Sequence, residues 1–178
     1  FSGLLPTNFA LGSGGDLSVE SESGYAPASD WFFQMVFVAT AASIVSGTSV
    51  SARSSVTVSL RQTPSHVQLL VSDDGCGVFD KICQAFDIAD AQHAMLELSK
   101  GRLTSQPQMH TGRGLFFTAR LADIIDLHAN AQAFQQRDWQ REQWHRTRPV
   151  CSQGSTVYVA FDLETERRLD DVLRRYSL

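Results

Sequence analysis

The stretch that decides the fold is His66-Val-Gln-Leu-Leu-Val-Ser-Asp-Asp-Gly-Cys-Gly77, an apolar, β-rich run that stops at two carboxylates and two glycines. Valine and leucine at this density favour a strand. The glycines allow a positive φ and let a ligand approach the backbone closely. A carboxylate placed there can accept a hydrogen bond from an amino group. The stretch therefore predicts a strand that ends in a binding turn.

A second glycine turn is Thr111-Gly-Arg-Gly-Leu115. It leads into the run 115–123, which holds no glycine or proline and predicts a helix. The free N–H groups at a helix start attract phosphate. Each turn alone is more often structural than functional, because Gly-x-Gly occurs in many surface turns. Their order and contexts together predict the two halves of a nucleotide pocket.

The segment 55–61, just before the first turn, alternates apolar and polar residues and predicts a strand. Its polar side chains, Thr57 and Ser59, should face solvent, while Val56, Val58 and Leu60 face the helices. With 63–65 as a turn, this strand should pair with 66–72 as a hairpin.

Further elements follow downstream. A helix is predicted over 90–100, ended by Gly101, with Ala94, Leu96 and Leu98 available for packing. Two strands are predicted, at 124–134 and 156–163. A final helix is expected over 165–176, where Leu169, Val172, Leu173 and Tyr176 form a stripe that more often packs on its own domain than on a partner.

These elements predict an α/β fold: a two-layer sandwich with helices on one face of a mixed, mainly antiparallel sheet. The Gly- and Ser-rich segment 1–30 adds an edge strand at 16–20. The main domain should span 31–163, followed by the C-terminal helix within 164–178. The longest apolar stretch, 31–45, is 15 residues long, which is short for a membrane span and predicts a buried core helix.

Composition narrows the function classes. The chain has 178 residues, 43% of them hydrophobic, which suits one compact domain. A net charge of −4 argues against a nucleic-acid surface, which would show a basic stripe. Basic residues gather in 137–148, where we favour a solvated hairpin anchored by Trp139 and Trp144 over a partner-docking loop. Three cysteines without metal-ligand spacing favour a reducing cytoplasm.

The motifs resemble the GHKL ATPase superfamily, whose Bergerat fold binds ATP, over Trp31 to Leu163. The resemblance implies that Asp73, Gly75 and Gly77 form the box whose carboxylate reads the adenine amino group. It also implies that Gly112, Gly114 and Leu115 lie beside the phosphates, that 78–111 form a lid, and that Gly154-Ser-Thr156 precedes the last strand. The segments 74–82, 93–101 and 110–118 are similar to a bacterial subgroup of histidine-kinase-like, anti-sigma-like proteins.

One departure from the family changes the functional expectation. Family members carry Glu-x-x-x-Asn on the first long helix, where the Asn holds magnesium and the Glu activates water in hydrolysing branches. The corresponding stretch here, 31–45, contains neither residue. A divalent ion needs oxygen ligands beside the phosphates. Weak or absent Mg-ATP chemistry is therefore expected, with no catalytic residue and no metal ligand assigned, although Gln34, Thr40 and Asp74 are polar groups that could partly replace the motif.

Three hypotheses remain open. The first is an ATP-binding regulatory domain of the GHKL type, a kinase or regulatory ATPase by family, in which Lys100 and Arg113 supply charge for the phosphates and Thr156 completes the pocket. It is equally plausible that Lys100 and Arg113 are solvated residues of the lid with no role in binding. The second is a degenerate, non-catalytic domain that grips a protein partner. The third is a sensor that holds another small molecule. A protein partner is expected, a homodimer stays open, and neither nucleic acid nor membrane binding is predicted.

Overall fold

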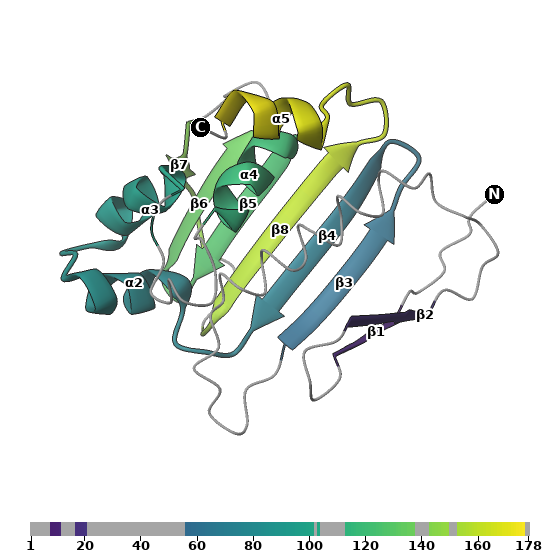
Figure 1. Ribbon diagram of the computed structural model, residues 1–178. Coiled ribbons are helices and arrows are strands. Elements are labelled where there is room, and N and C mark those ends of the chain that lie inside the picture. Colours follow the sequence, from purple (N-terminus) through teal and green to yellow (C-terminus); the bar gives the residue numbers. More distant parts are fainter. Residues whose placement is uncertain are drawn as a thin grey trace.

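The computed structural model describes residues 8–11, 17–20, 56–101, 103, 113–137, 143–149 and 153–176. Its main body is a six-stranded sheet in the order β3-β4-β8-β5-β6-β7, in which every neighbouring pair runs antiparallel (Figure 1). The strands are β3 (Val56–Gln62), β4 (His66–Asp73), β5 (Ile124–Ala129), β6 (Gln132–Arg137), β7 (His145–Arg146) and β8 (Ser155–Asp162).

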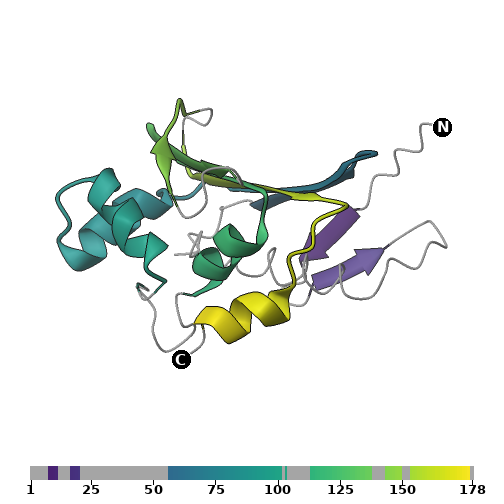
Figure 2. The same ribbon diagram turned by 90° about the horizontal axis from the view of Figure 1, so that it is seen from above.

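Four helices are described: α2 (Val78–Phe86), α3 (Ala91–Ser99), α4 (Gly114–Leu121) and α5 (Leu169–Tyr176). Figure 2 looks along the sheet and shows α4 and α5 on one face of it. Buried residues of α2 and α3 belong to the same hydrophobic core as α4 and the sheet. The protein is therefore a two-layer α/β sandwich, as the sequence predicts, but its six-stranded sheet is antiparallel throughout and not mixed.

The core lies between the sheet and these helices, and strand alternation decides which residues enter it. On β8, Val157, Val159 and Phe161 are each at most 2% exposed and face the helices. Neighbouring strands and helices add Leu69, Val71, Phe79, Met95, Ile125 and Leu127 to the same cluster. Burying one such large side chain stabilises the fold by about 1.5–3 kcal/mol. This apolar layer fixes the sheet against the helices and so fixes the loops at its ends.

The predicted hairpin is confirmed, because β3 and β4 pair antiparallel in the register Val56↔Asp73 to Gln62↔Val67. Both Thr57 and Ser59 are exposed, as alternation requires. The helix predicted over 90–100 is α3, with Asp90 as its N-cap and Gly101 (φ +68) following it. The C-terminal helix begins at Leu169, and Leu169 and Val172 pack against the core.

Three expectations need correction. The strand predicted over 124–134 is a hairpin, because Asn130 adopts a left-handed conformation (φ 49) and turns β5 into β6. Leu96 does not pack in the core but is 52% exposed, since Met95 takes the inward position on α3. The strand expected at 16–20 is β2 (Leu17–Glu20), which pairs with β1 (Asn8–Leu11) in a separate two-stranded sheet instead of edging the main one.

The core helix expected over 31–45 lies outside the described residues. Within the described ranges, no helix is long and apolar enough to cross a bilayer.

Candidate functional site

The first glycine turn is built around the carboxylate of Asp73, the last residue of β4. Its Oδ1 accepts the backbone N–H of Gly75 at 2.8 Å and that of Ser155 at 3.2 Å. The first bond is local and closes the turn. The second reaches 82 residues along the chain to the start of β8. Together they fix the plane of the carboxyl group.

The other carboxylate oxygen of Asp73 is different. Its Oδ2 is buried and has no hydrogen-bond partner within the described part of the chain. A buried acceptor left unpaired costs about 1–3 kcal/mol, so such atoms are nearly always satisfied in folded proteins. Because Oδ1 is already held by two backbone donors, Oδ2 is the atom that can accept a donor from elsewhere. An amino group or a water molecule is the chemistry that fits.

Glycine is required where β8 approaches this turn. A Cβ built on Gly154 would lie 1.9 Å from the carbonyl oxygen of Asp73, and Gly154 has φ +81. Backbone therefore packs directly on backbone at the point where the Asp73 carboxylate is held. At Gly75 a Cβ would lie 2.9 Å from Asp73 Oδ1, so a side chain there would push on the same carboxylate.

Asn130 ties three loops together at this end of the sheet. Its Nδ2 donates to the carbonyl oxygen of Cys76 at 2.9 Å and to Asp80 Oδ2, and its Oδ1 accepts the N–H of Gly154 at 3.0 Å. Its own backbone N–H donates to the Gly154 carbonyl at 3.1 Å. The first glycine turn and the segment around Gly154 that leads into β8 are thus both held by the β5–β6 turn. Sequence reasoning missed this residue, although an isolated Asn inside an apolar run is a turn signal.

Ser155 supplies a cap to α2 from a distance. The residue before the helix, Gly77 (φ 87), has no side chain to offer. The Ser155 hydroxyl accepts the N–H of Val78 at 2.9 Å instead, and Ser155 is 2% exposed. This bond lies in the same small region as the Ser155 N–H bond to Asp73. The carboxylate and the start of α2 are therefore held by one residue.

Thr156, the predicted pocket residue, lies on the other face of the sheet. Its hydroxyl is 2.7 Å from that of Ser72, its partner across the β4–β8 pair. Because side chains alternate along a strand, Thr156 faces away from the helix layer that Ser155 and Val157 face. The structure thus brings Ser155, and not Thr156, to the Asp73 carboxylate.

The second glycine turn opens a helix as predicted, since α4 begins at Gly114 with Arg113 as its cap residue. Arg113 is exposed. Leu115 is 3% exposed and belongs to the core. Gly112 lies outside the described residues. In Figure 1 the end of α4 meets the far end of β8, while its start points toward the end where β4 stops.

Lys100 follows α3 as its C-cap residue. Its ammonium pairs with Glu97 Oε1, one turn back, at 2.5 Å, and the Lys100 side chain is 52% exposed. Lys100 and Glu97 therefore form an exposed ion pair at the end of α3. The Glu97 carboxylate therefore partly neutralises the Lys100 charge.

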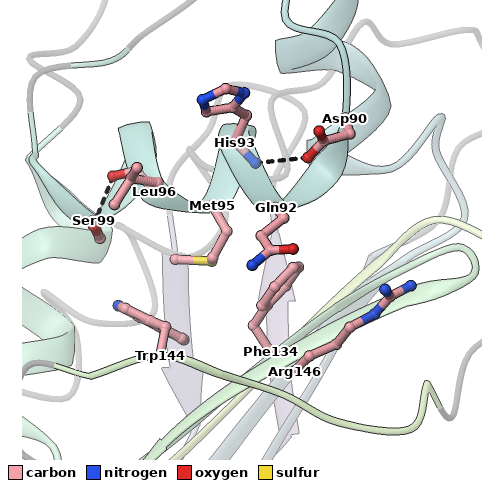
Figure 3. Close-up of a pocket in the computed structure, with 9 residues that line it drawn as sticks. All are labelled: Asp90, Gln92, His93, Met95, Leu96, Ser99, Phe134, Trp144 and Arg146. Carbon is pink, nitrogen blue, oxygen red and sulfur yellow. Dashed lines mark hydrogen bonds between the residues drawn. The ribbon is translucent and has the colours of Figure 1, made fainter.

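A separate hollow of about 450 Å³ lies between α3 and the β6–β7 pair (Figure 3). Met95 points down from α3 toward Phe134 and Trp144, while Asp90 and Arg146 lie at the polar end. None of the residues predicted to hold a nucleotide lines it. Trp144 packs against the hydrophobic core, as the anchored-hairpin interpretation expects, while Trp139 lies outside the described residues.

Two polar residues on the face of the sheet opposite the helices have side-chain pKa values shifted from their ordinary range. Burial raises the pKa of the Asp126 carboxyl, against a smaller opposing effect of the Arg137 guanidinium 3.2 Å away. Burial lowers the pKa of His128, which is 7% exposed, and the Asp126 charge opposes that shift. Both groups lie on β5, and neither was singled out by sequence motifs.

A search of the described ranges finds no cluster of three or more His, Cys, Asp or Glu side chains able to hold a metal ion. In comparisons with known proteins, no family model matches the chain and no curated protein matches it significantly.

Proposed function

We propose that this protein is an adenine-nucleotide-binding regulatory domain of the GHKL type, with weak or no ATP hydrolysis. The observation that carries the proposal is the Asp73 carboxylate, held through Oδ1 by two backbone donors and left with a buried, unpaired Oδ2. The adenine amino group is a donor of the kind that Oδ2 lacks.

Two further features support this assignment. No side chain stands at Gly75, so a flat base can approach the turn there, whereas at Gly77 the place of a side chain is taken by Asn130. The start of α4, with Arg113 beside it, offers backbone N–H groups and a positive charge to the phosphates. Magnesium is not required by this proposal, because the stretch 31–45 lacks the Glu and Asn that the resemblance would supply.

The regulatory part of the proposal is a protein partner, engaged in a reducing cytoplasm. The described cysteines, Cys76 and Cys83, are free thiols. The second candidate function is a non-catalytic interaction domain that has lost nucleotide binding. It is favoured by the same missing Glu and Asn, since loss of the metal site removes the usual reason to retain ATP.

Calorimetric titration of ATP and ADP, with magnesium and then with chelator, tests the proposal. Saturable binding is expected in both buffers. Asp73→Asn keeps an acceptor for the Gly75 and Ser155 N–H groups but turns Oδ2 into a donor, so ATP affinity should fall about tenfold or more. Asp74→Asn removes the same charge from the next, exposed residue and should leave affinity in the chelator buffer nearly unchanged.

Titration of GTP gives a more specific test, because guanine presents a carbonyl oxygen where adenine presents an amino group. GTP should bind the native protein poorly and should gain relative to ATP in Asp73→Asn. Equal ATP affinity of the native and Asp73→Asn proteins would refute the role of this carboxylate. No heat with any nucleotide in either buffer would contradict the nucleotide proposal and favour the interaction-domain alternative.

A further inference from the structure

The hollow between α3 and the β6–β7 pair has no part in the nucleotide proposal. Its volume of about 450 Å³ lies within the range of about 300–1,000 Å³ that is typical of small-molecule sites. On one side it is lined by α3 and the residue that caps it, and on the other by residues of β6, of β7 and just before β7. Neither Asp73 nor any residue of the turn that follows it is among the lining residues. A ligand held here would therefore occupy a second site.

The inner part of the hollow is apolar and largely aromatic. Met95 on α3 and Phe134 on β6 are 2% and 3% exposed, and in Figure 3 the Met95 side chain points toward Phe134 and Trp144. Trp144 packs on the core but keeps part of its surface exposed, and Leu96, which is 52% exposed, adds apolar surface to the lining. Aromatic rings and a thioether make favourable contacts with another ring. This part of the hollow therefore fits an aromatic group.

Two opposite charges also line the hollow, Arg146 and Asp90, and Figure 3 shows them on the same side of it. The Arg146 guanidinium donates to the neutral Gln132 Oε1 at 2.8 Å and pairs with no carboxylate within the described part of the chain. Asp90 caps α3, where its Oδ1 accepts the His93 N–H at 2.9 Å. This hydrogen bond lowers the pKa of Asp90, so the carboxylate is charged at neutral pH. The hollow thus offers one positive and one negative group that do not pair with each other.

An apolar, aromatic wall beside two opposite charges selects the class of ligand. An aromatic carboxylate would match the guanidinium of Arg146, whose planar fork suits carboxylate oxygens, but the Asp90 charge would repel it. An aromatic amine would match Asp90, but Arg146 would repel it. An α-amino acid carries both charged groups on one carbon, next to its side chain. We propose that this hollow binds a free aromatic α-amino acid, with its carboxylate on Arg146, its ammonium on Asp90 and its ring against Trp144 and Met95.

The test titrates L-tryptophan and L-phenylalanine into the whole chain and follows N–H chemical shifts in two-dimensional NMR. Saturable shifts are expected in α3, in β6 and β7, and at the indole N–H of Trp144. Arg146→Gln and Asp90→Asn should each weaken binding by about five- to tenfold, and the asparagine keeps the capping oxygen that α3 needs. Arg148→Gln and Asp87→Asn are the matched controls, because both residues are exposed and neither lines the hollow.

Ligand analogues assign each charge to its residue. Indolepropionate lacks the ammonium, so it should bind about fivefold more weakly than L-tryptophan and should not be weakened further by Asp90→Asn. L-Tryptophanamide lacks the carboxylate, so it should bind weakly and should not be weakened further by Arg146→Gln.

Several outcomes overturn the proposal. These are the absence of saturable shifts at the hollow, equal weakening by the two control variants, and binding of L-alanine or of either analogue as tightly as L-tryptophan. Asp73→Asn should leave L-tryptophan binding unchanged, which separates this site from the nucleotide proposal.

Discussion

The backbone of Gly154 lies so close to the carbonyl of Asp73 that an added Cβ would stand 1.9 Å from its oxygen. Contact at that distance is impossible, and the obstacle is backbone, which cannot rotate away. Gly154 also has φ +81, where side chains are strained. One glycine therefore permits the start of β8 to reach the carboxylate turn.

Gly154→Ala should destabilise the fold by about 3 kcal/mol or more, since left-handed strain and overpacking add together. Urea unfolding followed by circular dichroism measures this. Gly75→Ala is the comparison: its Cβ meets only a carboxylate oxygen, at 2.9 Å, so stability should change less than nucleotide affinity does. A Gly154→Ala protein as stable as the native one would contradict the close backbone approach.

Asn130 combines a left-handed backbone with three side-chain hydrogen bonds. Asn130→Ala should lose both and cost about 2–4 kcal/mol of unfolding free energy. Asn130→Gly keeps the freedom to adopt positive φ while removing the amide. The difference between the two variants, measured by chemical denaturation, gives the conformational part. If Asn130→Gly matches the native protein, the amide clamp contributes nothing.

The lowered pKa of buried His128 predicts that the protein loses stability in mild acid. Burial lowers its pKa in the folded state, so below the ordinary pKa of about 6.5 the unfolded chain binds the proton first. The unfolding free energy should therefore fall as pH drops from about 6.5 through the lower folded-state pKa. His128→Gln should remove this part of the slope. Measurements between pH 5 and 8, with exposed His93→Gln as control, check the assignment.

The raised pKa of Asp126 predicts the opposite pH dependence of the unfolding free energy, at lower pH. Burial raises its folded-state pKa, so the folded protein holds this proton more tightly than the unfolded chain does. Stability from this group is present below the ordinary pKa of about 3.9 and is lost as pH rises through the folded-state value. Asp126→Asn should flatten that segment of the stability curve. NMR titration of the Asp126 carboxyl carbon measures the folded-state pKa directly. A pKa that is not raised above the ordinary value would contradict the prediction.

The parts of the fold that could be predicted from the sequence are those determined by residues close together in the chain. Alternation in 55–61 and the apolar run ending at Asp73 predicted the β3–β4 hairpin, and Gly101 and Gly114 marked a helix end and a helix start. Each signal lies within a few residues of the structure it specifies.

The parts that were missed depend on partners far along the chain. Asn130 is a local turn signal, but its role in holding the site depends on its bonds to Cys76 and Gly154, which sequence does not report. The choice of Ser155 over Thr156 depends on strand parity, because moving one residue along a strand exchanges its faces. No spacing rule in a single sequence reports a contact between residues 82 positions apart.

The place of β8 in the sheet has a consequence for how the protein is made. It lies between β4 and β5, although it comes last in sequence among the described strands. During synthesis, β3–β4 and β5–β6 emerge as hairpins whose inner edges stay unpaired until β8 is extruded. Exposed edges of this kind invite pairing with other chains. Chains truncated between residues 137 and 155 should therefore aggregate. The Asp73 carboxylate acquires its Ser155 donor only when β8 enters the sheet.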